Sequence, residues 1–152
     1  MIDSKKLVEF AKHPELALQR LDQLLDLLDS EDEAELNTAS DLLENCGVPS
    51  IQDIPFLSEQ LKSGRSSRVY WCTTLLGRLG PTFGDELDRS RMHSELCHAI
   101  SDESLDLSAR ERAAWAVGEL GRVGSDCRTV LKNHVEKAPP RLKRLLETAL
   151  AT

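Results

Sequence analysis

The chain has 152 residues, of which 40% are hydrophobic and 30% charged, a balance typical of a folded domain that buries a core without disulfides or a metal. Its apolar runs are short and interrupted by charges, which argues against membrane insertion. Its first residues lack a secretory pattern, so we expect a cytoplasmic protein.

The charge is unevenly distributed along the chain. Residues 1–64 hold 14 acids and 5 bases, whereas residues 65–152 hold 12 acids and 14 bases. A strongly acidic half repels phosphates, so we do not expect nucleic acid as a partner.

Hydrophobic residues recur at helical spacing along almost the whole chain, and no segment alternates as a strand does. Pro14 and Pro140 each suit the first turn of a helix, where a missing N–H has no consequence. The sequence therefore predicts an all-α fold, with helices over residues 4–12, 14–28, 32–46, 51–62, 66–79, 85–101 (with a possible break), 108–120, 126–137 and 140–151.

Three of these helices end in one motif: two apolar residues, any residue, a polar residue, an apolar residue and glycine. The glycines are Gly47, Gly80 and Gly121, each placed where a helix end needs a positive φ. The repeat interval is 33 and then 41 residues, and the longer one contains an insertion at 81–91. We expect this insertion to be a long inter-helix loop or an extended helix start; the alternative is a functional loop. Eight positions before each glycine stands a small residue that would let a neighbouring helix approach closely: Ala39, Cys72 and Ala113.

Other helices alternate with these three, and four of them carry an apolar pair one turn apart. A short polar turn follows each pair, so we expect helix pairs that cover one another's apolar sides. The apolar pairs are Leu24 and Leu28, Leu57 and Leu61, Leu96 and Ile100, and Leu131 and Val135.

The segment ARERAAWAVGELG, residues 109–121, resembles the first helix of a HEAT repeat, in particular the short bacterial units also found in phycocyanobilin lyase-type repeats. Arg110 matches the family's early arginine; in the preceding unit Arg68 is displaced by one residue, and residues 35–47 have no arginine. The resemblance implies a short right-handed α-α superhelix, a HEAT-like solenoid of about four helix pairs. It also implies a single repeat domain over residues 1–152, with an N-terminal cap helix in 1–13 and a C-terminal cap helix in 139–152.

The sequence contains no motif that indicates catalysis or a cofactor. Cys46, Cys72, Cys97 and Cys127 lie far apart among apolar neighbours, so we interpret them as reduced core thiols. His93 lies one helical turn before Cys97, but no second cluster completes a tetrahedral metal site. We therefore expect no catalytic residues, no metal and no cofactor.

Trp71 and Trp115 differ in their position within the repeat: they stand nine residues before Gly80 and six before Gly121, respectively. Either both pack between repeats, or one is buried and the other is partly exposed. An exposed tryptophan would be a candidate binding hot spot.

HEAT-like repeats serve mainly as scaffolds, so the resemblance predicts a non-catalytic scaffold or adaptor that binds a protein or peptide partner on its concave surface. The second helices of such pairs line that surface. Because the exposed ridge along them grades from acidic to neutral or basic, a peptide with a basic end is the expected guest. The ridge consists of Asp26, Glu59, His98 and Asn133.

Two alternatives remain open. HEAT-like folds include alkylpurine DNA glycosylases, and lyase-type relatives handle bilins, so the resemblance also admits an enzyme or an enzyme accessory. The basic segment 122–144 is the part that would suit DNA. The other alternative is a structural module that stacks on itself or on a larger protein; the sequence leaves the oligomeric state undecided.

Overall fold

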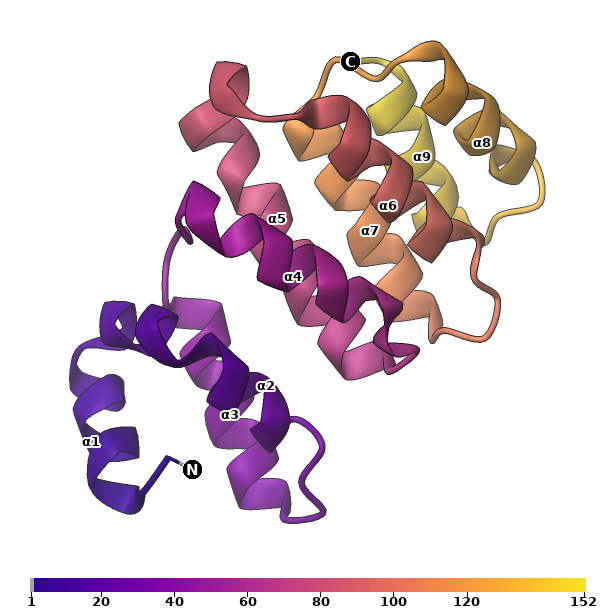
Figure 1. Cartoon of the computed structure of the whole chain (residues 1–152). Coiled ribbons are helices and arrows are strands. Elements are labelled where there is room, and N and C mark those ends of the chain that lie inside the picture. Colours follow the sequence, from indigo (N-terminus) through magenta and orange to yellow (C-terminus); the bar gives the residue numbers. More distant parts are fainter. Residues whose placement is uncertain (1) are drawn as a thin grey trace. The chain divides into compact units, whose positions relative to one another are not determined.

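Helices make up the regular structure of the chain. The computed structural model describes residues 2–152, and within them it contains helices and turns but no strand (Figure 1). The prediction of an all-α fold is confirmed.

The helices closely follow the predicted ranges, and three of these ranges, 14–28, 51–62 and 85–101, contain 3-10 segments. Residues 14–28, predicted as one helix, are divided because Arg20 leaves helical geometry at φ −132° and ψ 34°. The α-helices are α1 (Ser4–Lys12), α2 (Leu21–Leu27), α3 (Glu33–Asn45), α4 (Ile54–Gln60), α5 (Ser66–Phe83), α6 (Arg89–Ser101), α7 (Leu107–Leu120), α8 (Ser125–Val135) and α9 (Pro140–Leu150). The 3-10 segments are η1 (Pro14–Arg20), η2 (Ile51–Asp53), η3 (Leu61–Ser63) and η4 (Gly84–Glu86).

The chain divides into two compact units, Met1–Val48 and Pro49–Thr152. The resemblance to HEAT repeats predicts one repeat domain over residues 1–152. The division falls just after α3 and the glycine that follows it, where Gly47 has the predicted positive φ of 86°.

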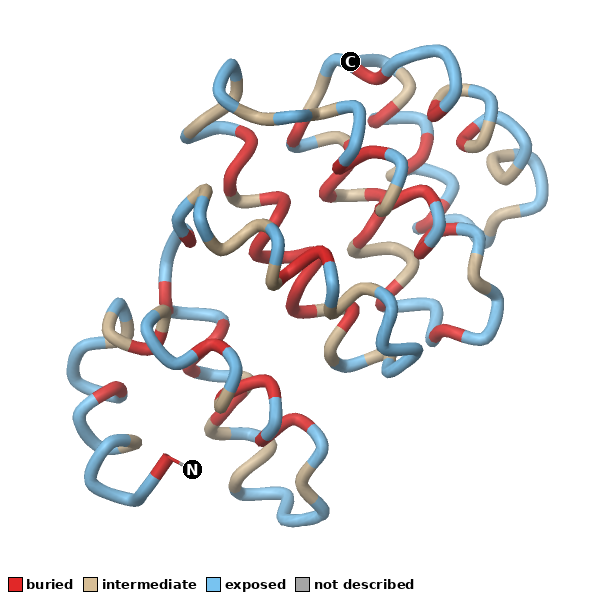
Figure 2. The backbone as a smooth tube through the Cα atoms, viewed as in Figure 1, coloured by how far each residue is buried: buried red, intermediate tan, exposed pale blue. Residues whose placement is uncertain are grey.

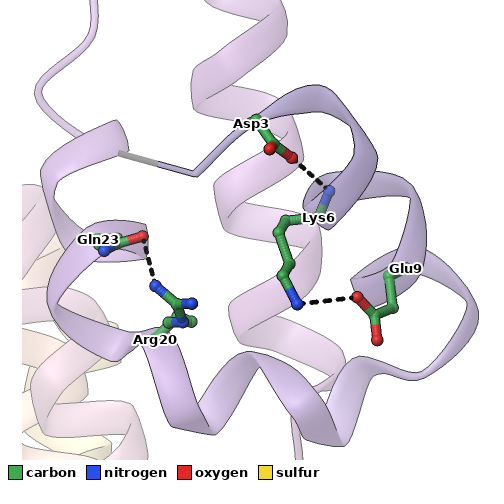
Figure 3. A network of polar contacts seen from close by, with 5 residues as sticks. All are labelled: Asp3, Lys6, Glu9, Arg20 and Gln23. Carbon is green, nitrogen blue, oxygen red and sulfur yellow. Dashed lines mark hydrogen bonds and ion pairs between the residues drawn. The ribbon is translucent and has the colours of Figure 1, made fainter.

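In the N-terminal unit, α1 packs on η1 and α3, and α2 packs on α3. The core consists of Phe10 from α1 together with leucines of α2 and α3, such as Leu24 and Leu43. The Asp3 carboxylate caps α1 by accepting from the Lys6 N–H at 2.9 Å (Figure 3).

Two further polar contacts of this unit lie at the surface. The Lys6 ammonium pairs with Glu9 at 3.2 Å, and the Arg20 guanidinium donates to Gln23 at 3.4 Å (Figure 3). Because both lie at the surface, they contribute little to stability.

The C-terminal unit consists of three successive helix pairs, α4 with α5, α6 with α7, and α8 with α9 (Figure 1). Helix α7 lies between α5 and α9, while α6 lies beside α8, so the pairs form two layers. Figure 2 shows a long buried stretch along α5. The core between the layers includes Leu57, Leu75, Leu79, Leu96, Ile100, Val117, Leu120, Leu131 and Leu142.

The predicted helix end at Gly80 is wrong. Helix α5 continues through Gly80 and Pro81 to Phe83, and Gly80 does not have a positive φ. The reason is packing: a Cβ at Gly80 would collide with the carbonyl of Glu119 in α7 and lie 3.0 Å from the Cα of Leu120. Gly80 therefore allows two helix backbones to touch, whereas Gly121, with φ 67°, ends its helix as predicted.

The insertion at 81–91 is mostly helical, and its end is hydrogen-bonded to α7. It forms the last turn of α5, η4 and the start of α6. The Arg89 guanidinium donates from Nε to the carbonyl of Leu120 at 2.8 Å, which satisfies a carbonyl at the end of α7. Arg128 of α8 does the same for α9, donating to the carbonyl of Leu150 at 2.7 Å. Each of the two helices is thus capped by an arginine from the other layer.

Candidate functional site

The predicted ridge residues are all exposed. Asp26 lies on α2, Glu59 on α4, His98 on α6 and Asn133 on α8. Asp26 belongs to the N-terminal unit and the other three to the C-terminal unit.

Two hollows interrupt the layer that carries Glu59, His98 and Asn133. One, of about 370 Å³, lies between η3 and α6, and the other, of about 580 Å³, lies between α6 and α8. His98 lines both hollows, whereas Glu59 and Asn133 line neither. The three side chains therefore share a layer without enclosing a common site.

A cluster of two aromatic rings and one arginine occupies the other layer. The Arg112 Cζ lies 4.9 Å from the centroid of the Tyr70 ring and 4.9 Å from that of the Trp115 ring. Both distances are within the range of cation–π attraction. The Arg112 Nη2 also donates to the Tyr70 hydroxyl at 2.7 Å, joining positions 42 residues apart in sequence.

The two tryptophans have different environments. Trp71 is buried at 9% exposure, whereas Trp115 is half-buried. Of the two possibilities that the sequence left open, the one with a buried and a partly exposed tryptophan is correct. Trp71 also holds Tyr70 in place, because their rings pack edge to face at 5.1 Å and 83°.

Gly77 determines where the Trp115 ring lies. A Cβ at Gly77 would be 2.5 Å from Cζ3 of Trp115 and 3.1 Å from the Cα of Ala116. Since α5 presents no side chain there, the indole rests close to the α5 backbone and beside Arg112. Trp115 and Arg112 are thus positioned by a packing contact between α5 and α7.

A small hollow of about 160 Å³ opens next to this cluster. Its rim carries an ion pair between Arg141 Nε and Glu111 Oε2 at 3.1 Å, and Glu111 is the less exposed partner, at 13% against 74%. The hollow is lined by Tyr70, Ser108, Glu111, Arg112, Trp115, Arg141 and Leu145. It combines aromatic stacking surfaces, two arginines and an apolar side chain, a composition typical of binding hot spots.

Residues 2–152, which the structure describes, contain no cluster of three or more His, Cys, Asp or Glu side chains suited to a metal. His93 hydrogen-bonds through Nε2 to the carbonyl of Gly121 at 2.7 Å, so this nitrogen has a structural partner. Burial lowers the pKa of His93, and the charge of Arg89 lowers it further, against the effect of the Gly121 bond.

Comparisons with known proteins show no match to any family model and none to a curated protein. The resemblance to HEAT repeats stays a prediction. Within residues 2–152, none of the helices combines the length and apolar character that crossing a bilayer requires.

The Tyr70–Arg112–Trp115 cluster was not predicted from the sequence. A local signal was available, because Arg112 and Trp115 stand three residues apart and share one face of a helix. The contribution of Tyr70 could not be found in this way, since it depends on how α5 and α7 pack.

Proposed function

We propose that the chain is a non-catalytic protein-interaction scaffold of stacked, HEAT-like helix pairs, and that its C-terminal unit binds an acidic peptide segment of a partner protein. The order of the pairs supports this proposal. The pairs α4–α5, α6–α7 and α8–α9 follow one another in space as they do in sequence, which is how solenoids are built.

The observation that carries the proposal is the arrangement of Arg112. Its guanidinium is held by two rings and one hydroxyl, while its Nε and Nη1 have no hydrogen-bond partner among residues 2–152. A guanidinium fixed in this way loses little conformational entropy on binding. Either of these nitrogens, together with the second N–H of Nη2, can hold a carboxylate through two parallel hydrogen bonds. Trp115 and Leu145 provide apolar surface in the same hollow.

Charge complementarity favours an acidic guest. The charged side chains that line the hollow are Arg112, Arg141 and Glu111, and Glu111 is already paired with Arg141. The net charge at this place is therefore positive. An acidic peptide with an aromatic or aliphatic residue beside its carboxylate would match both the charge and the stacking surface.

The proposed face differs from the ridge predicted on the other layer. Gly77 and Gly80 bring α5 and α7 into backbone contact, whereas the α4, α6 and α8 layer is separated by hollows. A stack whose helices lie closer together on one side bends toward that side. We therefore assign the concave surface to α5, α7 and α9.

Selection from a library of random peptides tests the proposal. The expected binders contain an acidic residue next to an aromatic or aliphatic one. Arg112→Lys, which keeps the charge but loses the planar guanidinium, should weaken them by about fivefold or more, since hot-spot substitutions exceed about 1 kcal/mol.

The matched control is a Glu59→Lys, His98→Glu double variant, which alters the predicted ridge and should leave the affinity for these peptides unchanged. Circular dichroism verifies that all variants stay helical. Binders that tolerate Arg112→Lys but are lost in the ridge variant would move the binding surface to the other layer.

A further inference from the structure

Two cysteines meet in the larger hollow of the C-terminal unit. The Sγ atoms of Cys97 in α6 and Cys127 in α8 lie 2.6 Å apart, although the residues are 30 positions apart in sequence. Both residues line the hollow of about 580 Å³ between α6 and α8. A hollow of this size is in the range that holds small molecules.

We propose that Cys97 and Cys127 form a reversible thiol–disulfide site, which a low-molecular-weight disulfide such as oxidised glutathione converts to an intramolecular disulfide between α6 and α8. A covalent S–S bond is about 2.05 Å long, so the two sulfur atoms need to approach by only about 0.5 Å. The contact between the sulfurs supplies the proximity, and the hollow supplies the access.

The two thiols are not equivalent. The hydrogen bond from Cys97 lowers the pKa of Cys127, the charge of Arg128 lowers it further, and burial opposes both. Cys127 also lies in the first turn of α8, where backbone N–H groups stabilise a thiolate. The same hydrogen bond, together with burial, raises the pKa of Cys97. Cys127 is therefore the attacking group and Cys97 the resolving one.

The reaction is balanced as two exchange steps. The Cys127 thiolate attacks one sulfur of the disulfide RSSR, forming a mixed disulfide and releasing RS⁻. Cys97 passes its proton to that RS⁻ and attacks the Cys127 sulfur, which releases a second RS⁻ that takes a proton from water. The protein loses two electrons to the reagent, and two molecules of RSH leave.

The other two cysteines serve as internal controls. All four cysteines are buried, but Cys46 and Cys72 line neither of the hollows beside α6, whereas Cys97 and Cys127 line the larger one. Burial raises the pKa of Cys72 to about 12, so its thiolate is scarce at neutral pH. In the folded chain they should react far more slowly than Cys127.

The test treats the full chain with oxidised glutathione, alkylates the remaining thiols and identifies the products by peptide mass spectrometry. We expect the Cys97–Cys127 disulfide first, with Cys46 and Cys72 still alkylated, and reversal by dithiothreitol. The bridge should raise the Tm by about 5 °C or more. Oxidation of all four cysteines at similar rates, or no Cys97–Cys127 bond in a chain that stays folded, would overturn the proposal.

Two variants separate the roles. Cys97→Ser should stop at a mixed disulfide on Cys127, whereas Cys127→Ser should leave Cys97 unmodified over the same time. Limited alkylation of the unsubstituted chain gives the same information without a change in folding. Cys127 should be labelled at least about tenfold faster than Cys97, and equal labelling would contradict the assignment.

Discussion

The indole of Trp115 rests against Gly77 of the neighbouring helix: a Cβ at Gly77 would lie 2.5 Å from Cζ3 of that ring. Trp115 in turn lies beside the Arg112 guanidinium, which bonds to Tyr70. A missing side chain on α5 thus determines the geometry of the proposed binding surface.

Replacing Gly77 by alanine should displace the indole. The added methyl group overlaps the ring, so we expect the stability to fall by about 1 kcal/mol, the gain in helix propensity offsetting part of the overlap. In a Trp71→Phe background the fluorescence should report Trp115 alone, and its emission should shift to the red as the ring becomes more exposed. An unshifted emission maximum would show that the ring does not depend on Gly77.

Gly80 should tolerate alanine much less than Gly118 does. A Cβ at Gly80 meets backbone atoms of Glu119 and Leu120, which cannot rotate away, so Gly80→Ala should cost about 3 kcal/mol. At Gly118 a Cβ would lie 3.8 Å from the Cα of Ala149, an ordinary contact. Gly118→Ala should therefore be neutral or stabilise by up to about 1 kcal/mol. Urea denaturation measures the free energy of unfolding of both variants. Equal losses of stability would contradict the packing described between α5 and α7.

Arg128 should contribute more to stability than a surface arginine. It donates to the carbonyls of Val123 at 3.1 Å and Leu150 at 2.7 Å, so Arg128→Ala should cost about 2 kcal/mol. Arg91, whose side chain is 75% exposed and pairs with Glu95, is the matched control, with an expected loss below about 0.5 kcal/mol. Thermal melts compare the stability of the two variants. A larger loss of stability in Arg91→Ala than in Arg128→Ala would contradict the prediction.

His93 should make the chain less stable in mild acid. Burial lowers its pKa below the ordinary 6.5, so the unfolded chain takes up a proton more readily than the folded one. This contribution is fully present above pH 6.5 and is lost as the pH falls through that value toward the lower folded-state pKa. His93→Gln keeps a donor for the Gly121 carbonyl but does not titrate. Between pH 7.5 and 5.5, about one unit on either side of the ordinary pKa, the free energy of unfolding of this variant should fall less than that of the unsubstituted chain. An identical fall in both proteins would rule out His93 as the cause.

Most helices could be predicted from the sequence because helical periodicity and capping are local properties. The end at Gly80 could not, because glycine serves two purposes that look alike in sequence. At Gly47 and Gly121 it supplies a positive φ, while at Gly80 it allows another backbone to approach. Only the packing partner, Glu119, distinguishes the two.

The proposed site was harder to predict than the helices. That Trp71 and Trp115 could differ in exposure followed from their different places in the repeat. The stacking of Arg112 on Tyr70, however, depends on the distance between α5 and α7, which tertiary packing determines. The contact between Cys97 of α6 and Cys127 of α8 likewise depends on tertiary packing.

The two tryptophans offer the most direct measurement of where a partner binds. Each indole N–H gives its own signal in a ¹H–¹⁵N NMR spectrum, and substitution of Trp71 by phenylalanine assigns them. On titration with a selected acidic peptide, the Trp115 signal and those of neighbouring α7 residues should shift while the Trp71 signal stays in place. Shifts confined to residues around Glu59, His98 and Asn133, with Trp115 unmoved, would contradict the proposed surface.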